Sequence, residues 1–317
     1  MEYKLKKITG DASFREFYRV QKGSKSSIVI FARKDKFKNL ITYSAVNQIL
    51  NKNGILAPRL LSNFNSQNII EISDLGKISF NDFIRKKRNK FKSYKKLIDI
   101  IIKMQKIKFK ENYTFKKHQI KFEKYNIKNL HKESDLFFDW YLNYLFSKKK
   151  VRRIKSKIKK ELNQLYKKLV LKNSCFTHRD FHASNIMISK GKLGVIDSQD
   201  AILGNPLYDV VSVIDDVRIK IPNNIQIELL EYYLRKKNFQ KNKIKNDFYI
   251  LSIQRNFKIL GIFVRLYKRD KKSNYLKYLP NTWSLIEKRM KNPILKNLKK
   301  LIEKEFSIKK LKKVKFR

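Results

Sequence analysis

The stretch that decides the fold reads Cys175-Phe-Thr-His-Arg-Asp-Phe-His-Ala-Ser-Asn-Ile-Met-Ile-Ser189 and resumes as Lys192-Leu-Gly-Val-Ile-Asp-Ser-Gln-Asp200. It places Asn185 five residues after Asp180, and it places Asp197 at the end of an apolar run. Phosphoryl transfer from ATP needs one carboxylate to orient the attacking hydroxyl and hard oxygen ligands to hold Mg²⁺ on the phosphates. The pattern therefore predicts a phosphoryl-transfer site that uses ATP and Mg²⁺ as cofactors.

Two short apolar runs, 185–189 and 192–197, flank Lys190-Gly191 and predict a β-hairpin. A five-residue loop would bring Asn185 back beside Asp180, and the hairpin would return Asp197 to the same end. Asp180 is then the predicted catalytic base, and Asn185 and Asp197 are the predicted Mg²⁺ ligands. The structural alternative makes His178 a core histidine, Asp180 a turn residue and Asp197 the cap of a strand end.

Length and composition indicate an ordinary globular protein. With 317 residues, 42% of them apolar, the chain has room for one large or two moderate domains. Its single cysteine excludes an internal disulfide and fits a reducing compartment. There is no signal-peptide-like apolar segment and no run of about 18 apolar residues, and the four histidines show no metal-ligand spacing typical of zinc. We expect a cytoplasmic monomer without a membrane span.

The charge is strongly basic, because 76 Lys and Arg residues stand against 27 Asp and Glu residues, for a net charge of +49. Such an excess is typical of proteins that bind nucleic acid or anionic membranes. Here the lysines are spread from end to end and accompany abundant Ile and Asn, the residues of AT-rich codons. We therefore favour genome composition as the cause and do not expect a nucleic-acid partner. The alternative is a functional basic surface, for which Lys148–Lys160 is the candidate.

The first part of the chain predicts a small sheet with one helix. Residues 26–32 form a β-branched run typical of a buried strand, and residues 10–20 alternate enough to form a strand before it. Apolar residues at helical spacing predict a helix over 39–52. Two further short strands are predicted at 58–61 and 68–72.

After Gly76 the pattern changes to helices, interrupted by the hairpin of the motif region. The predicted helices cover 81–88, 94–108, 120–146, 154–171, 208–216, 225–236, 247–268 and 281–303. The basic tail, 309–317, is expected to be frayed. The predicted fold class is α+β, with a small β-rich nucleotide-binding lobe over 1–76 and a larger, mainly helical catalytic and substrate-binding lobe over 77–317.

The motif His178-Arg-Asp-Phe-His-Ala-Ser-Asn185, with Ile196-Asp-Ser-Gln-Asp200, resembles the aminoglycoside phosphotransferase/choline kinase family, which implies a protein-kinase-like two-lobe fold. Further segments are similar to the bacterial cell-wall amino-sugar kinases of that family. These segments are Asp11–Arg15, Asp74–Gly76, Phe137–Tyr141, Asp197–Ala201, Gly204–Asp209 and Gln254–Arg265. The resemblance implies ATP-dependent phosphorylation of the anomeric hydroxyl of N-acetylmuramate or N-acetylglucosamine during peptidoglycan recycling.

The resemblance also implies where the nucleotide binds. Residues 10–15 would form the turn that covers the ATP phosphates, and Asp74–Gly76 would form the hinge whose backbone pairs with the adenine edge. The nucleotide-binding residues so implied are Gly10, Asp11, Ala12, Ser13, Phe14, Asp74 and Leu75.

On the substrate side, the resemblance implies that Trp140 and Tyr141 line the sugar site with aromatic faces. Core packing of a long helix is the alternative for Trp140. Asp200 is expected to contact the substrate or the metal shell, and Arg255 to contact the substrate. Asp209 is expected to be structural.

The sequence departs from the kinase pattern in three places. Only Gly10 is present in a phosphate-covering loop that is usually glycine-rich, so backbone N–H groups or Ser13 would have to cradle the phosphates. The strand around 28–31 has no lysine for the phosphates. Arg33 or Lys34 just beyond it would be the substitute, but we favour the alternative that each is a solvated surface cation. Ser198 stands where an aromatic residue usually follows the metal-binding aspartate.

Two alternatives remain at this stage. The first keeps the kinase but changes the acceptor to choline, an amino acid or an aminoglycoside. A cationic acceptor needs an acidic pocket, for which the available carboxylates are Glu133, Asp135, Asp139, Asp215 and Asp216. The second is a basic nucleic-acid-binding protein without catalytic activity, built on the same scaffold.

Overall fold

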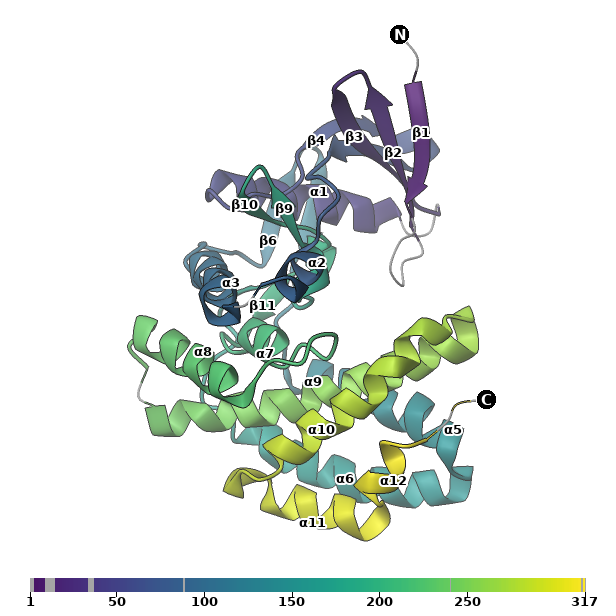
Figure 1. The fold of residues 1–317 in the computed structure, drawn as a ribbon, viewed down its shortest axis with the longest axis vertical. Helices are drawn as coiled ribbons and strands as arrows, with labels where there is room; N and C mark the ends of the chain where they lie inside the picture. The colour runs from purple at the N-terminus through teal and green to yellow at the C-terminus, as the bar shows by residue number, and fades with distance from the viewer. Residues whose placement is uncertain are drawn as a thin grey trace. The chain divides into compact units, whose positions relative to one another are not determined.

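The structure is a computed structural model that describes residues 3–8, 15–33, 37–87, 89–239, 241–314 and 316. The chain divides into two compact units, residues 1–123 with 175–203 and residues 124–174 with 204–317. Figure 1 draws the elements of both units in the colour order of the chain. The predicted lobe boundary after residue 76 lies inside the first unit, and it stays a prediction.

A five-stranded antiparallel sheet opens the first unit. In the order β1-β2-β3-β5-β4 its strands are Tyr3–Ile8, Glu16–Lys22, Lys25–Phe31, Ile69–Ser73 and Leu60–Phe64. The strands predicted at 26–32 and 68–72 are confirmed, whereas the sequence pattern does not predict β1. Residues 4–7 of this edge strand are exposed, so it has no buried face that would leave a hydrophobic pattern.

One face of this sheet packs against helix α1 (Phe37–Lys52), which confirms the helix predicted over 39–52. The buried cluster between them consists of Ile28, Ile30, Ala32, Leu40, Tyr43, Ile70 and Ile72. β-branched side chains fit the pleated surface of a sheet, and burial of each Ile or Leu side chain stabilises the unit by roughly 1.5–3 kcal/mol.

The predicted hairpin is confirmed as β9 (Ile186–Ser189) paired with β10 (Lys192–Val195). Hydrogen bonds fix it to two segments near the sheet, since the Ile188 amide donates to the Ile78 carbonyl and the Val195 amide to the Leu56 carbonyl, both at 2.8 Å. Gly194 permits this close approach, because a Cβ atom there would lie 2.6 Å from Leu75 Cδ1. The ends of the hairpin are therefore held next to the strands.

The remaining elements of the first unit connect the sheet to the motif region. They are α2 (Phe80–Arg85), α3 (Lys90–Gln105), the hairpin of β6 (Asn112–Phe115) and β7 (His118–Lys121), β8 (Cys175–Thr177) and the 3₁₀ turns η2 (Asn65–Gln67), η4 (Ala183–Asn185) and η5 (Ser198–Asp200). β8 pairs with β11 (Ile202–Gly204). The single helix predicted over 120–146 is wrong at its start, because residues 118–121 pair with β6 and the helix begins only at Ile127.

The second unit is helical. Its helices are α4 (Ile127–Leu136), the π-helix η3 (Phe137–Leu142), α5 (Asn143–Leu145), α6 (Lys148–Lys167), α7 (Tyr208–Ile214), α8 (Asn223–Lys236), α9 (Lys241–Asp270), the 3₁₀ helix η6 (Ser273–Tyr278), α10 (Leu279–Arg289), the 3₁₀ turn η7 (Pro293–Leu295), α11 (Lys296–Glu305) and α12 (Ile308–Leu311). The long helix α9 packs on α4, η3, α7 and α10. The sheet followed by a mostly helical remainder confirms the α+β class.

Two predictions about the end of the chain are corrected. The helix predicted over 281–303 is interrupted after Arg289, where Pro293 opens a 3₁₀ turn because a proline ring is incompatible with a helix interior. The first residues of the tail predicted to be frayed, 309–311, belong instead to α12, where Leu311 is buried.

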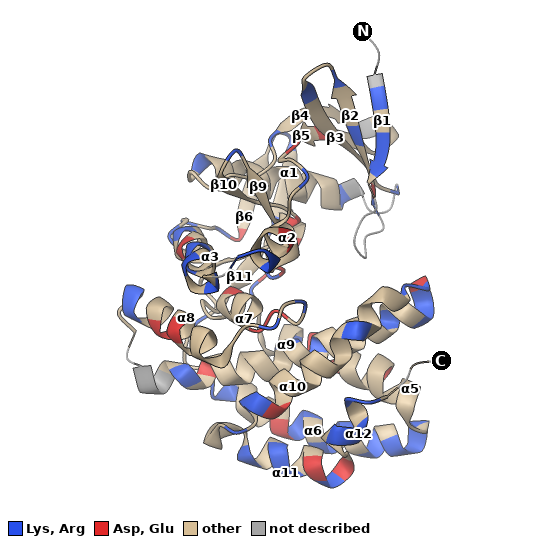
Figure 2. Ribbon diagram, in the orientation of Figure 1, with Lys and Arg blue, Asp and Glu red and all other residues tan. Residues whose placement is uncertain are grey.

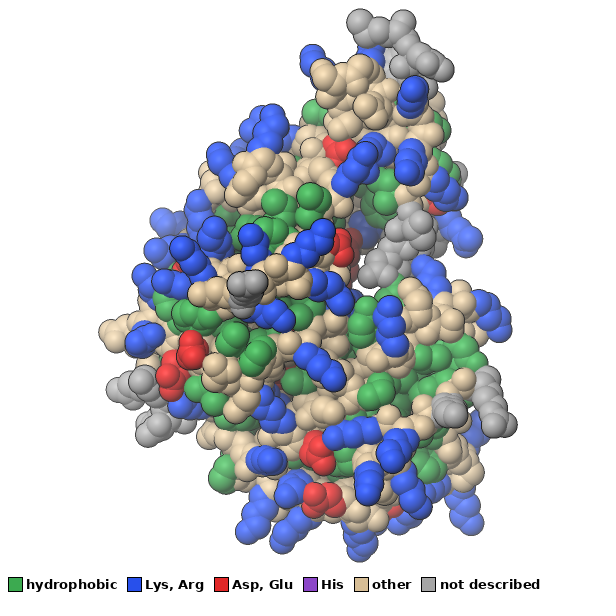
Figure 3. Space-filling model, viewed as in Figure 1, with side chains coloured by type: hydrophobic (Ala, Val, Ile, Leu, Met, Phe, Trp, Pro, Cys, Tyr) green, Lys and Arg blue, Asp and Glu red, His purple; other side chains and the backbone are tan. Residues whose placement is uncertain are grey.

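The basic charge is spread over the molecule. Figure 2 shows Lys and Arg on strands and helices from β1 to α12, and Figure 3 shows them dispersed among apolar and neutral side chains on the face in view. In α6 the apolar residues Val151, Ile154 and Ile158 are buried while Arg152 and Arg153 are exposed. The 148–160 segment thus has the form of an ordinary amphipathic helix. Within the described residues, no helix has the length and apolarity needed to span a membrane.

Candidate active site

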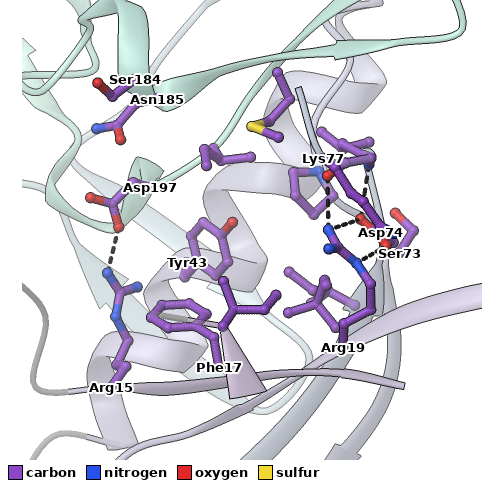
Figure 4. Close-up of a pocket in the computed structure, with 18 residues that line it drawn as sticks. Arg15, Phe17, Arg19, Tyr43, Ser73, Asp74, Lys77, Ser184, Asn185 and Asp197 are labelled. Atoms are coloured by element: carbon purple, nitrogen blue, oxygen red, sulfur yellow. Dashed lines mark hydrogen bonds and ion pairs between the residues drawn. The ribbon is translucent and has the colours of Figure 1, made fainter. Parts of the chain in front are cut away.

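The first unit encloses a cavity of about 390 Å³, a size suited to a small-molecule ligand. All 18 residues that line it belong to this unit. Figure 4 shows its polar side chains gathered at two ends, with Arg15, Asn185 and Asp197 at one end and Arg19 and Asp74 at the other. Apolar side chains line the cavity as well, among them Phe17, Ile28, Ile72, Met187 and Ile196. A ligand with a polar group at each end and a flat apolar part would fit this lining.

One wall of the cavity comes from alternate residues of the chain at β2, namely Arg15, Phe17 and Arg19. Successive side chains of a strand point to opposite faces, so these three share one face. Arg15 is the last residue of the predicted phosphate-covering turn, whereas the sequence pattern gives no site role to Arg19. The spacing of two arginines around an aromatic residue at period two is the signal that would have indicated them.

At one end of the cavity, Asp74 is held by a bidentate ion pair with Arg19. Arg19 donates from Nε at 2.6 Å and from Nη2 at 3.1 Å, and the same Nη2 donates to the Gly76 carbonyl at 2.9 Å. The Gly76 amide and the Ser26 hydroxyl also donate to the Asp74 carboxylate, at 2.8 and 3.0 Å. This network fixes the backbone of residues 74–76 at the cavity wall, where Leu75 also lies.

Burial and hydrogen bonding act in opposite directions on Asp74. Burial by itself raises the pKa of its carboxyl, whereas the hydrogen bonds from Arg19, Gly76 and Ser26 lower it. The hydrogen bonds and the charge of Arg19 prevail, and the pKa lies below its ordinary value. Asp74 is therefore a charged structural anchor, and the predicted contact of this hinge with adenine would fall to the backbone.

At the other end, the structure brings Asn185 and Asp197 together in the cavity lining. The Asn185 amide nitrogen donates to the Asp180 carbonyl at 3.0 Å, and the Ile196 amide donates to the Asn185 carbonyl at 3.0 Å. These bonds tie both residues to the loop and the hairpin that the motif predicts. Asp197 adopts the left-handed backbone conformation with φ of 64°, a strained state that often occurs at functional sites.

The oxygens of Asn185 and Asp197 suit Mg²⁺, which prefers hard oxygen ligands. Among the described residues no cluster of three or more His, Cys, Asp and Glu side chains could hold a metal ion. Mg²⁺ at this place would therefore need water and phosphate oxygens to complete its octahedral shell. That is the way Mg²⁺ is held in sites that bind it together with a nucleotide.

Asp180, the predicted base, lies beside this end of the cavity and is not among the residues that line it. Its side chain is 47% exposed, and Oδ1 lies 3.5 Å from His182 Nε2. The Asp180 backbone carbonyl accepts a hydrogen bond from the Asn185 side-chain amide, so the predicted base and the predicted metal ligand belong to one loop. Its role as the catalytic base stays a prediction.

His178 is a core residue, as the structural alternative held for this position. It is fully buried, and its Nε2 lies 3.1 Å from the Ile196 carbonyl, the arrangement of an N–H donor. Burial is the main cause that lowers the pKa of His178, so the ring is neutral near pH 7. His178 thereby connects the loop before Asp180 to the residue before Asp197.

The other predicted nucleotide residues are placed as follows. Gly10, Asp11, Ala12, Ser13 and Phe14 lie outside the described residues, as does Lys34. Arg33 is exposed and does not line the cavity.

The predicted substrate residues occupy different environments. Asp200 is exposed and accepts a hydrogen bond from the Gln199 side chain at 3.1 Å. Trp140 is half-buried in the second unit, whereas Tyr141 is fully buried there and its hydroxyl accepts a hydrogen bond from Trp283 at 2.7 Å. Arg255 is buried in α9, and its Nη1 has no hydrogen-bond partner among the described residues. Tyr141 thus has the surroundings of a core residue, and substrate contact by any of the four stays a prediction.

Comparison with known proteins places these motifs in a family context. The family model described as the phosphotransferase enzyme family matches residues 4–241. An N-acetylmuramate/N-acetylglucosamine kinase of Pseudomonas aeruginosa is 26% identical over 286 residues, which cover 88% of this chain and 81% of the relative. A kinase of the same name from Neisseria meningitidis is 23% identical, and the alignment covers 88% of this chain and 83% of the relative.

Solved structures share the fold at low sequence identity. A thermostable mutant of aminoglycoside phosphotransferase APH(4)-Ia, in ternary complex with AMP-PNP and hygromycin B, aligns with a TM-score of 0.63 at 10% identity, over 90% of this chain and 94% of that one. A choline/ethanolamine kinase family protein from Mesorhizobium loti aligns with a TM-score of 0.62 at 12% identity, over 94% and 92%. The predicted protein-kinase-like α+β fold is confirmed.

Proposed function

Because this chain belongs to the phosphotransferase enzyme family, we propose that it is an ATP-dependent kinase that phosphorylates the anomeric hydroxyl of N-acetylmuramate or N-acetylglucosamine. The observation that carries the proposal is the lining of one cavity by Asn185 and Asp197 at one end and by Asp74–Gly76 at the other. A nucleotide also has polar groups at both ends, with the hydrogen-bonding edge of adenine at one end and the phosphates at the other.

In this proposal the backbone of residues 74–76 pairs with adenine, and the apolar strand residues cover its faces. Asn185 and Asp197 hold Mg²⁺, which neutralises charge on the phosphates when it is bound. Asp180 accepts a hydrogen bond from the sugar hydroxyl and then its proton. The loop that joins Asp180 to Asn185 holds the catalytic base and the metal ligand in place relative to one another.

The choice of an amino sugar is supported by the relatives that align over most of both chains. A cationic acceptor such as choline finds less support, because the acidic side chains it would need are engaged within the second unit. Glu133 is buried against Lys258 at 2.9 Å, and Asp215 pairs with Arg289. Asp135, Asp139 and Asp216 have cationic partners as well.

The test is a phosphorus NMR spectrum of the product formed from Mg-ATP and each candidate acceptor. We expect N-acetylmuramate or N-acetylglucosamine to give an acid-labile sugar 1-phosphate, and choline and aminoglycosides to remain unmodified. The methyl glycoside of N-acetylglucosamine is the matched control, since its anomeric oxygen is blocked and it should not react. Phosphorylation of that glycoside would show that another hydroxyl is the acceptor, and failure of both sugars would refute the substrate assignment.

A further inference from the structure

We propose that Arg15 binds the nucleotide phosphates and thus takes over the role for which this chain lacks a strand lysine. The inference rests on the proposed use of ATP and adds to it a residue that contacts the nucleotide. In protein kinases a lysine on the third strand approaches the phosphates. Here the only cation of β3 is Lys25, which is exposed beside the turn between β2 and β3.

Arg15 lies at the end of the cavity where the phosphates would be. Its side chain is 5% exposed, lines the cavity and forms an ion pair with Asp197, and its Nη1 donates to Gln199 at 2.9 Å. The guanidinium group lies 5.4 Å from the ring centre of Phe17 and 5.8 Å from that of Tyr43. The two rings restrict the guanidinium group to the cavity wall, and they supply a cation–π contact that partly offsets its burial.

The other cations of the described cavity lining are less suited to this role. Arg19 is bound to the Asp74 carboxylate and to the Gly76 carbonyl at the opposite end. Lys77 is exposed, and Figure 4 shows it near Arg19 rather than near Asp197. Arg15 is therefore the cation of this lining that shares an end with both predicted Mg²⁺ ligands.

The ion pair with Asp197 explains how a buried arginine is accommodated before the nucleotide binds. A buried cation without a counter-charge is strongly unfavourable, and Asp197 supplies that charge. Asp197 would share its carboxylate with a bound Mg²⁺, and the guanidinium group would then gain phosphate oxygens as new partners. Arginine suits this exchange, because its planar group can donate two parallel hydrogen bonds to a phosphate.

Binding measurements on the full chain separate a phosphate contact from a purely structural role. Mg-ADP and adenosine are titrated by calorimetry into the wild type, Arg15→Met and Arg15→Lys, with thermal unfolding to verify the fold. We expect Arg15→Met to weaken Mg-ADP binding by about 10- to 100-fold, the range for a lost charge-assisted hydrogen bond, and to leave adenosine binding within about twofold. Arg15→Lys should lie between the wild type and Arg15→Met, since it keeps the charge and loses the planar group.

Two control variants sharpen the comparison. Arg19→Met should weaken the binding of Mg-ADP and of adenosine by the same factor, because Arg19 fixes the backbone of residues 74–76. Arg33→Met, at an exposed position outside the lining, should change neither. If Arg15→Met lost the same factor of affinity for both ligands, or kept its affinity for Mg-ADP unchanged, the assignment would be overturned. A wild type that binds no Mg-ADP would instead refute the proposed use of ATP, and the Arg15 inference with it.

Discussion

The hydroxyl of Ser198 donates a hydrogen bond to the side-chain oxygen of Asn47 at 2.7 Å, and both residues are buried. The bond joins the turn that follows Asp197 to helix α1. Ser198 stands where the family pattern has an aromatic residue, and the structure shows how this departure is accommodated. The turn is held to the helix by a hydrogen bond instead of by the packing of an aromatic side chain.

We predict that Ser198→Ala destabilises the chain by about 1–3 kcal/mol, because it leaves the buried Asn47 oxygen without its donor. Denaturant unfolding measures the loss. Ser156→Ala on the exposed side of α6 is the matched control and should be neutral or slightly stabilising, since alanine favours a helix. The double variant with Asn47→Ala should lose less than the sum of the two single variants, and strict additivity would show that the two side chains are not coupled.

Gly261 gives a second prediction, which concerns the second unit. A Cβ atom there would lie 2.2 Å from the Leu136 carbonyl oxygen, where α9 meets the end of α4. Gly261→Ala should therefore cost about 3 kcal/mol or more, because a backbone atom has to move, even though alanine by itself favours a helix by roughly 1 kcal/mol. Gly23→Ala, with open space around it and φ of 56°, should cost only about 1 kcal/mol. A stabilised Gly261→Ala variant would mean that these helices are not so closely packed.

The Arg19–Asp74 pair predicts a specific dependence on pH. Asp74 has a lowered pKa in the folded state, so its contribution to stability is present above the pKa of the unfolded chain. That contribution is lost as the pH falls through the lower pKa of the folded state. The stability of Asp74→Asn should therefore decline less steeply with acidification below about pH 4. Arg19→Met should flatten the same region, and stability curves parallel to that of the wild type would contradict the assigned network.

The predicted base and metal ligand should be separable by experiment. Asp197→Asn should lose the dependence of ADP binding on Mg²⁺, which chelation with EDTA reveals in the wild type. Asp180→Asn should keep that dependence, but its turnover should fall by about 10²- to 10⁴-fold, the usual range for a catalytic base. Asp270→Asn, the same change at the end of α9, should alter neither quantity. If Asp180→Asn lost Mg-ADP binding while Asp197→Asn kept it, the two roles would be interchanged.

Local patterns in the sequence are sufficient to predict the elements that carry the motif. The hairpin of β9 and β10 is predictable because its turn and both apolar runs lie within residues 185–197, and the family resemblance built on the same residues is confirmed. The helix over 120–146 was predicted wrongly at its start, since residues 118–121 owe their strand conformation to pairing with β6. Pairing energy outweighed a helical spacing that is only a weak preference.

By itself the sequence determined the α+β class, the family and the loop that links Asp180 to Asn185, because these follow from residues near one another in the chain. Only the tertiary structure decided which cation accompanies Asp197, since Arg15 lies 182 positions away and no local pattern connects the two. It also decided that Asp74 serves as the partner of Arg19. The first pairing arises from the packing of the hairpin beside the sheet, and the second from the order of strands β2, β3 and β5 within the sheet. Both bring distant charges to one partly dehydrated cavity, where each requires an opposite partner.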